Sequence, residues 1–274
     1  MRVVEALEQY RRSGAAIPAF NIPGFDALVG IGEAAAEADA PVIIQTSARL
    51  VVELGTETLR KQCDLVREQS GAELFLHLDH CSDFDLIESC ARAGWDMVMF
   101  DGSHFPIDVN LEGTSRIVAM AHELGVAVEA EVGPIGGEED GLSGTATSAD
   151  ASDIATIATS GADCLAVGFG NVHGVYADKG LLDWPLFESA YDIAELPLVL
   201  HGGTGLTSDE LHRAVRAGAA KVNVSTELKH GYHAAITDPE VVDSVIASPN
   251  LLHTVLREKT RAIAGRFIQE LACT

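Results

Sequence analysis

An aspartate and a histidine stand side by side at the end of an apolar stretch of strand length. The stretch is Leu74–Asp79, His80 follows it, and a helix-start signal comes at Ser82-Asp83. An ionised carboxylate at a buried strand end is costly unless it is paired or lies near a metal ion. The pair therefore indicates a metal site or an acid–base site. The alternative, an Asp-His pair that only caps the next helix, stays open on this motif alone.

Polar side chains recur at the ends of later apolar stretches, and three of them are histidines. His80, His173 and His201 follow three different predicted strands. Three neutral imidazoles with an open position are typical of a catalytic divalent-metal site, most often zinc. His77, inside a strand, is predicted to be core or to support the site. We expect the other histidines to lie in a rim loop or on solvated helices: His104, His122, His212, His230, His233 and His253.

Two other strand ends have the composition of a phosphate site. Gly202-Gly203-Thr204 follows one predicted strand, and Asn223-Val224-Ser225-Thr226 ends the next. Glycines let backbone N–H groups approach an anion, and helix N-termini add their dipoles. Two ordinary turns with helix caps would explain each threonine singly, but explain the pairing of the two turns less well.

The elements that must position these residues alternate between apolar strands and amphipathic helices. Continuous apolar strands predict a parallel sheet that is covered on both faces. Eight such units have the size of a closed (β/α)₈ TIM barrel, whose active site lies at the C-terminal strand ends. An open, doubly wound sheet is the alternative. The predicted strands are 17–21, 41–46, 74–79, 96–101, 126–132, 164–169, 196–201 and 220–224, and the predicted helices are 2–12, 25–38, 56–70, 83–93, 106–124, 149–160, 186–194 and 208–217.

The whole chain, 1–274, is predicted to form a single α/β domain. The barrel would occupy about 15–230, and an extra C-terminal helical tail about 231–274. A long polar loop, 133–148, interrupts the alternation and contains five glycines. Loops of this length inside a compact domain are usually functional or mobile.

The charge of the chain excludes several classes of partner. Lys and Arg number 18 against 41 Asp and Glu, so the net charge is −23. Nucleic-acid binding needs a basic face, and an anionic membrane would repel this surface. No apolar run reaches the roughly 18 residues of a membrane span, and the N-terminus lacks the apolar segment of a signal peptide. The five cysteines are odd in number and widely spaced, which favours reduced thiols in a cytoplasmic protein.

Taken in order, the strand-end motifs resemble the class II, zinc-dependent fructose/tagatose-bisphosphate aldolases. The resemblance extends from Pro18 to about Thr226. The motifs are Leu76-His77-Leu78-Asp79-His80, Phe100-Asp101-Gly102-Ser103-His104, Val128-Glu129-Ala130-Glu131-Val132-Gly133, Gly136-Gly137-Glu138-Glu139-Asp140, His173-Gly174-Val175-Tyr176, His201-Gly202-Gly203-Thr204-Gly205 and Lys221-Val222-Asn223-Val224-Ser225-Thr226.

The resemblance implies a metal-dependent aldolase. Such an enzyme cleaves a ketose (bis)phosphate reversibly to dihydroxyacetone phosphate and an aldehyde, through a zinc-stabilised enediolate. Zn²⁺ would be held by His80, His173 and His201, with Glu131 behind the metal as a supporting or alternate ligand. Asp79 would handle the proton on the aldehyde oxygen. A monovalent cation, Na⁺ or K⁺, is a further candidate cofactor, and the resemblance implies a homodimer or homotetramer.

Glu139, on the glycine-rich loop, would remove the proton next to the ketone. Three stretches depart from the family pattern, at 22–25, at 48–51 and at Ser225, and all should lie near the aldehyde half of the substrate. Which ketose phosphate is cleaved therefore stays open. The substrate-binding residues carried over are Asn21, Ser47, Gly174, Gly202, Gly203, Thr204, Asn223, Ser225 and Thr226, and the candidates for a distal anion are Arg49, Arg257 and Arg261.

Two other functions stay open. A Schiff-base aldolase on the same fold needs a buried lysine of lowered pKa inside the barrel. Lys221 opens the last predicted strand, at the end away from the rim, and the other lysines are predicted to be exposed: Lys61, Lys179, Lys229 and Lys259. A non-catalytic barrel used as a scaffold would be favoured if a ligand were missing, and none of the three histidines is.

Overall fold

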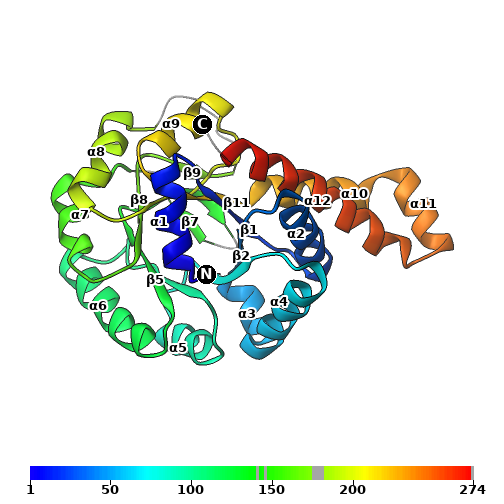
Figure 1. Ribbon diagram of the computed structural model, residues 1–274, viewed down its shortest axis with the longest axis horizontal. Coiled ribbons are helices and arrows are strands. Elements are labelled where there is room, and N and C mark those ends of the chain that lie inside the picture. Colours follow the sequence, from blue (N-terminus) through cyan, green and yellow to red (C-terminus); the bar gives the residue numbers. More distant parts are fainter. Residues whose placement is uncertain (140–141, 145–146, 175–181, 273–274) are drawn as a thin grey trace.

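Eight parallel strands close into a barrel in the computed structural model, which describes residues 1–139, 142–144, 147–174 and 182–272 (Figure 1). The strands follow one another around the barrel in chain order, and the last pairs with the first. The predicted TIM barrel is confirmed, and the open doubly wound sheet is excluded. The barrel strands are β1 (Ile17–Asn21), β2 (Val42–Ser47), β3 (Leu74–Asp79), β4 (Met97–Phe100), β5 (Ala127–Val132), β8 (Cys164–Val167), β10 (Leu198–Leu200) and β11 (Ala219–Val224).

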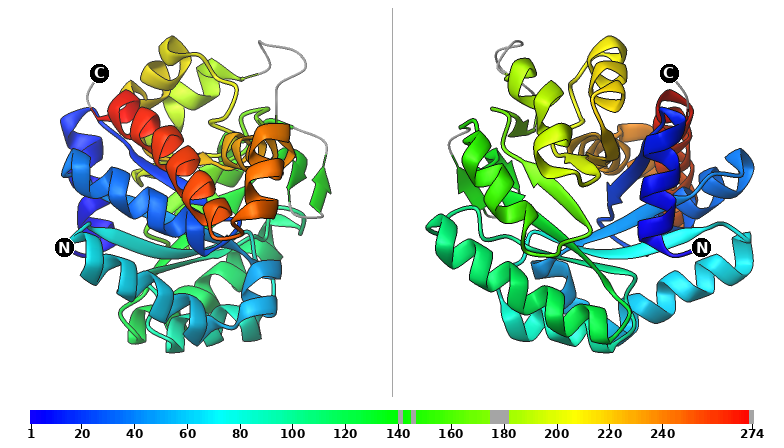
Figure 2. Two further views of the ribbon diagram at one scale, coloured as in Figure 1. Left: turned by 90° about the vertical axis from the view of Figure 1, so that its right-hand side faces the viewer. Right: turned by 60° about the vertical axis from the view of Figure 1, so that its left-hand side comes forward.

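Helices surround the barrel on its outer side, as both views in Figure 2 show. α1 (Val3–Ser13) differs from the rest, because it contributes Val3, Ala6 and Leu7 to an apolar cluster formed with inward-facing strand residues. This cluster seals one end of the barrel. The other helices up to the last strand are α2 (Phe25–Ala38), α4 (Thr56–Ser70), α5 (Phe84–Arg92), α6 (Ile107–Glu123), α7 (Ala151–Ala158), α8 (Trp184–Ala194) and α9 (Ser208–Arg216).

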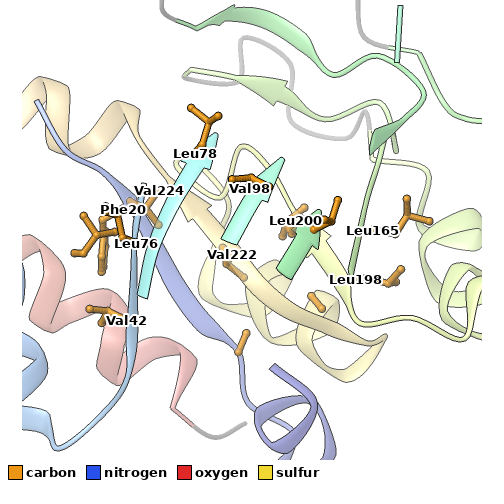
Figure 3. Close-up of a cluster of buried hydrophobic side chains, with 14 of the residues drawn as sticks. Phe20, Val42, Leu76, Leu78, Val98, Leu165, Leu198, Leu200, Val222 and Val224 are labelled. Atoms are coloured by element: carbon orange, nitrogen blue, oxygen red, sulfur yellow. The ribbon is translucent and has the colours of Figure 1, made fainter. Parts of the chain in front are cut away.

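Strand β3 shows how the sequence places apolar and polar side chains on opposite faces. Successive side chains in a strand alternate in direction. Leu74, Leu76 and Leu78 therefore join the outer apolar cluster beneath the helices, part of which is drawn in Figure 3. His77 and Asp79 alternate with these leucines and are also buried, so they must point into the barrel. The same alternation directs polar side chains inward from the other strands.

The structure differs from the sequence prediction in two segments near the rim. α3 (Ala48–Leu54) occupies a stretch that was expected to be irregular, and the Ser47 hydroxyl caps it by accepting from Leu50 N. The predicted loop 133–148 contains two strands, β6 (Gly136–Glu139) and β7 (Leu142–Gly144). β6 pairs with β9 (Val172–His173), so this sheet depends on a segment far along the chain. No local pattern could have indicated it.

The predicted C-terminal helical tail consists of three helices. They are α10 (Thr226–Thr237), α11 (Pro239–Ala247) and α12 (Leu251–Leu271). The first break falls at Asp238, whose carboxylate caps α11 in front of Pro239. α12 returns along α2, while α11 projects from the barrel (Figure 1). Within the described part of the chain, no helix combines the length and apolarity that a membrane crossing requires.

Candidate active site

Two of the predicted metal ligands meet directly on the rim. His80 follows β3 and His201 follows β10, and His201 Nδ1 lies 2.9 Å from His80 Nε2. Their rings are nearly perpendicular, at 81°. One carboxylate oxygen of Asp79 lies within 4.8 Å of a nitrogen of each histidine. The sequence prediction that strand ends distant in the chain share one rim therefore holds for this trio.

Carboxylates hold the ring nitrogens that face away from this contact. His80 Nδ1 lies 3.0 Å from Asp101 Oδ2 and 3.3 Å from Glu131 Oε2. His201 Nε2 lies 2.9 Å from Glu129 Oε1. A metal-bound histidine commonly gives its other N–H to a carboxylate, which fixes the tautomer and the ring orientation. Both histidines have this arrangement.

The backbone at His80 is strained. Its φ is +39°, in the left-handed region that residues with a β-carbon rarely adopt. The turn follows directly on β3, and His80 N donates to Met99 Sδ at 3.3 Å. Such strain is retained where surrounding contacts over-determine it, and it clusters at functional sites. Here it accompanies the close contact between the two imidazole rings.

Asp79 is held between two amides. Asn21 Nδ2 donates to Oδ2 at 2.7 Å, and Asn223 Nδ2 donates to Oδ1 at 3.4 Å. All three side chains are buried. Asn21 ends β1 and Asn223 lies near the end of β11, so the two strands at the barrel closure clamp the carboxylate from β3. A carboxylate fixed in this way can exchange a proton with a ligand at a defined position.

The charges around His80 favour a protonated imidazole. Burial alone would lower the pKa of His80, but nearby carboxylates, Asp79 foremost, outweigh burial and raise that pKa well above its usual value. Burial also acts to raise the pKa of Asp101, but the hydrogen bond with His80 holds it far below the ordinary value. Burial, followed by the charge of Asp101, raises the pKa of Glu131. A metal ion must displace such a proton to bind the imidazole.

The residues predicted to bind a phosphate lie on two adjacent loops. Gly203 N donates to Asn223 O at 3.0 Å, and a β-carbon at Gly203 would overlap Val222. Only glycine therefore lets the loop after β10 approach β11. The Thr204 hydroxyl accepts from Glu227 N at 3.4 Å, which ties this loop to the first turn of α10. Gly202 and Gly174 both have positive φ, and Ser225 and Thr226 begin α10.

His173 and Glu139 are placed only by their backbones. Gly137 of β6 is paired with His173 of β9, and Glu139 ends β6 opposite Leu142 of β7. Glu139 was expected on an irregular loop, whereas its backbone belongs to a strand. The predicted roles of both side chains lie outside the described part of the structure.

Of the three arginines predicted to reach a distal anion, only Arg49 lies beside the site. It lines a small pocket of about 170 Å³ together with Asn21, Ser47 and Lys229. Arg49 itself is exposed and pairs with Glu53 at 3.2 Å. Arg257 and Arg261 lie on α12 and form ion pairs with carboxylates of α2, Glu33 and Glu37 respectively. Neither lines this pocket.

Lys221 is not where the sequence placed it. It was expected at the start of the last strand, at the end of the barrel away from the rim. In the structure its side chain is fully buried inside the barrel. Its Nζ donates to Glu129 Oε2 at 2.7 Å, and the other oxygen of this carboxylate, Oε1, contacts His201. Lys61 and Lys259 are exposed, as predicted, whereas Lys229 is half-buried, and Lys179 lies outside the described residues.

Three further side chains support the site without having been assigned a role. Asp101 contacts His80 at 3.0 Å; its motif was among those that carry the family resemblance, but Asp101 itself was given no role. Asn171 is buried and donates to His201 O at 3.0 Å, while its side-chain oxygen accepts from Phe169 N. Asn110 donates to Glu131 O at 2.8 Å from α6. Nothing in the local pattern distinguishes Asn110 and Asn171 from surface asparagines.

A closed (β/α)₈ barrel with imidazoles and carboxylates gathered at its C-terminal rim has the architecture of a barrel enzyme. The family of class II fructose-bisphosphate aldolases matches residues 1–274. The chain therefore belongs to this family, as the motifs of its sequence predicted. Membership and fold together support an aldolase function, that of a carbon–carbon lyase.

Solved structures of named aldolases are similar over nearly the whole chain. A provisionally named fructose-1,6-biphosphate aldolase from Coccidioides immitis has a TM-score of 0.90 at 27% identity, and the match covers 99% of this chain and 96% of that one. The YdjI aldolase from Escherichia coli K12 has a TM-score of 0.84 at 26% identity, covering 99% and 97%. Fructose-bisphosphate aldolase from Campylobacter jejuni, at 22% identity and a TM-score of 0.84, shares the fold over 98% and 93%.

The donor set fits the divalent metal ion that the family implies. Imidazole and carboxylate are ligands of zinc, and adjacent nitrogens around a tetrahedral zinc ion lie roughly 3.3 Å apart. The facing nitrogens of His80 and His201 are separated by a similar distance, 2.9 Å. With their other nitrogens on carboxylates, both rings present these atoms to a common point.

Proposed function

We propose that this chain is a zinc-dependent ketose-phosphate aldolase that releases dihydroxyacetone phosphate and an aldehyde. His80, His173 and His201 would hold the zinc ion, with Glu131 as a supporting ligand. When bound, the ion would polarise the ketone carbonyl and stabilise negative charge on its oxygen. The contact between His80 and His201, each backed by a carboxylate, is the observation that carries this proposal.

Asp79 is the proposed acid–base group at the bond that breaks. In the cleavage direction it accepts the hydroxyl proton of the carbon that becomes the aldehyde. The carbon–carbon bond then breaks, and its electron pair passes towards the ketone carbonyl. Asn21 and Asn223 hold the carboxylate of Asp79 in place for this step. Glu139 returns a proton to the carbon of the ketose-phosphate half, which completes the exchange.

The loops after β10 and β11 are the proposed seat of the ketose phosphate. The approach of Gly203 to β11 and the start of α10 at Ser225 support this placement. Backbone N–H groups at such a turn can bind a phosphate without a cationic side chain. The residues proposed to hold the dihydroxyacetone phosphate half are Gly174, Gly202, Gly203, Thr204, Asn223, Ser225 and Thr226.

The pocket beside Asn21 and Ser47 is the proposed site of the aldehyde half. Arg49 and Lys229 bring positive charge to this pocket, and the carboxylate of Glu53, which pairs with Arg49, also lines it. The chain as a whole has a net charge of −23. With two cationic side chains against one carboxylate, the pocket favours an aldehyde that ends in an anionic group. Which sugar satisfies this requirement is the part of the proposal that a substrate screen decides.

The placement of Lys221 inside the barrel makes a Schiff-base aldolase worth testing as the second candidate. A coupled aldol-cleavage screen of ketose phosphates, run with and without added zinc and with EDTA, separates the two. The proposed enzyme loses turnover in EDTA and regains it with zinc, and borohydride with substrate leaves it unmodified. Turnover that persists in EDTA, with covalent trapping at Lys221, would establish the Schiff-base mechanism instead.

A further inference from the structure

Three buried charged or polar side chains contact one another in series inside the barrel, below the rim. His201 Nε2 lies 2.9 Å from Glu129 Oε1, and Lys221 Nζ donates to Glu129 Oε2 at 2.7 Å. All three side chains are fully buried. His201 follows β10, Glu129 lies on β5 and Lys221 on β11, so the contacts join two neighbouring strands to a third strand further around the barrel.

A buried ion pair is a weak way to stabilise a fold. Removing two charges from water offsets most of their attraction, and apolar side chains of similar size often serve stability as well or better. The layer closer to α1 consists of such apolar residues, including Phe75, Met97 and Val199. Stability alone therefore gives no reason for Glu129 and Lys221 to replace apolar residues in the next layer.

The geometry supplies another reason. Lys221 occupies one oxygen of Glu129 and leaves the other directed at His201. Because a carboxylate only accepts hydrogen bonds, His201 must carry its proton on Nε2. Its Nδ1 is then the atom that faces His80. Lys221 thus acts on His201 through Glu129, without touching the imidazole.

We propose that Glu129 and Lys221 are positioning residues that fix the tautomer and orientation of His201 for metal binding. This inference rests on the proposed function, because it assumes that His201 Nδ1 binds a divalent ion. Loss of the hydrogen-bond partner of a metal-bound histidine typically weakens metal binding by roughly 10- to 100-fold. A pair that only balances charge would leave metal affinity intact once the charges are removed together.

Two double variants separate these roles. Glu129→Leu with Lys221→Met removes both charges and the acceptor for His201. Glu129→Gln with Lys221→Met removes both charges but keeps an amide oxygen that can accept from His201. Neither leaves an unpaired buried charge, so both should fold; thermal unfolding of the metal-free proteins checks this.

The affinity for Zn²⁺, measured by competition with a chromophoric chelator, is the main readout. We expect the Leu variant to bind Zn²⁺ roughly 10- to 100-fold more weakly than wild type, and the Gln variant to recover most of that loss. The visible spectrum of the Co²⁺-loaded proteins should change in the same order, since it reports the ligand field directly. Cys164→Ala is the matched control, because its thiol lies 3.9 Å from Glu129 Oε2 in the same layer. Its affinity and spectrum should remain those of wild type.

Wild-type affinity in both double variants would overturn the inference and reduce the pair to charge balance. Equal weakening in both would overturn it too, because the acceptor would then not matter. A wild-type protein that binds neither ion would contradict the proposed function itself. The two failures are therefore distinguishable.

Discussion

The two halves of the rim differ in how completely their polar atoms are paired. Around His80 and His201, carboxylates occupy the outward ring nitrogens, and Glu129 is paired in turn with Lys221. On the other half, Asn21 Oδ1, Asn223 Oδ1 and the Ser225 hydroxyl are buried without a hydrogen-bond partner among the described residues. Glu131 Oε2, on the side of His80, also lacks a hydrogen bond, but it lies 3.3 Å from His80 Nδ1. Natural proteins pair nearly all buried polar groups, so each exception needs an explanation, and a bound ligand is one such explanation.

This difference matches the two tasks proposed for the site, which are metal binding and substrate binding. The half that would hold a metal ion is organised before any ligand arrives, which is what precise coordination requires. The half that would hold the substrate keeps unpaired acceptors and a hydroxyl for the substrate to satisfy. The predictions below test the two halves separately.

The largest expected effect comes from removing a proposed metal ligand. His201→Ala should abolish zinc binding and nearly all turnover, because it removes a ligand together with the contact that orients His80. Metal content by atomic emission and the rate of aldol cleavage measure both losses. His230→Ala, on an exposed part of α10, is the control and should behave as wild type. A His201→Ala protein with full zinc content and activity would refute the ligand assignment.

The next effect separates the two proton-transfer groups. Loss of a general base typically slows a reaction by ~10²- to 10⁴-fold. Glu139→Ala should lose exchange of the ketose-phosphate proton with solvent. Asp79→Ala should keep part of that exchange while losing carbon–carbon cleavage, since it acts on the aldehyde side. Proton exchange followed by NMR measures the first step alone, and the opposite pattern would mean that the roles are reversed.

A smaller effect is expected at the distal end of the substrate. A charged hydrogen bond contributes roughly 1.5–3 kcal/mol, so Arg49→Ala should raise KM for a bisphosphate about tenfold or more. Proton exchange of dihydroxyacetone phosphate alone should be unaffected. Arg257→Ala and Arg261→Ala are comparison variants, because both side chains are engaged by α2 within the chain. An effect at these positions instead of Arg49 would indicate that the distal group is bound from α12.

The smallest effect belongs to Ser225, whose buried hydroxyl is unpaired. Ser225→Ala should raise KM by about 2- to 10-fold, the worth of one hydrogen bond of roughly 0.5–1.5 kcal/mol. Its thermal stability should be equal to or above that of wild type, because an unsatisfied buried group is removed. Lower stability with an unchanged KM would show that the hydroxyl serves the fold and not the substrate.

Where the alternation of a strand decides the direction of a side chain, its position was predictable from the sequence. β3 alternates leucine with Phe75, His77 and Asp79, and that alternation alone sends Asp79 to the interior rim. The barrel followed from eight such strands and its closure was confirmed. The convergence of His80 and His201 followed from the rule that parallel strands end on one rim.

Features that depend on long-range pairing were not predictable. Lys221 looked misplaced because the strand was predicted to begin beside it, at Ala220. β11 begins one residue earlier, at Ala219, and the side chain of Lys221 reaches Glu129. The sheet formed by β6, β7 and β9 was read as a loop, because glycines carry no strand signal and the pairing strand lies far along the chain. In both cases the partner, and not the local sequence, decides the structure.

The closure of the barrel has a consequence for how the protein is made. His201 is separated from His80 by 121 residues, and Lys221 from Glu129 by 92. During synthesis the early strands leave the ribosome well before β10 and β11, and the seam between β1 and β11 forms last because its partners are so distant in the chain. A nascent chain therefore holds Asp79 and His80 without the partners that complete the cluster. If His80 and His201 hold the proposed metal ion, their site is complete only when the ring closes, which would make metal uptake a late event in the life of each molecule.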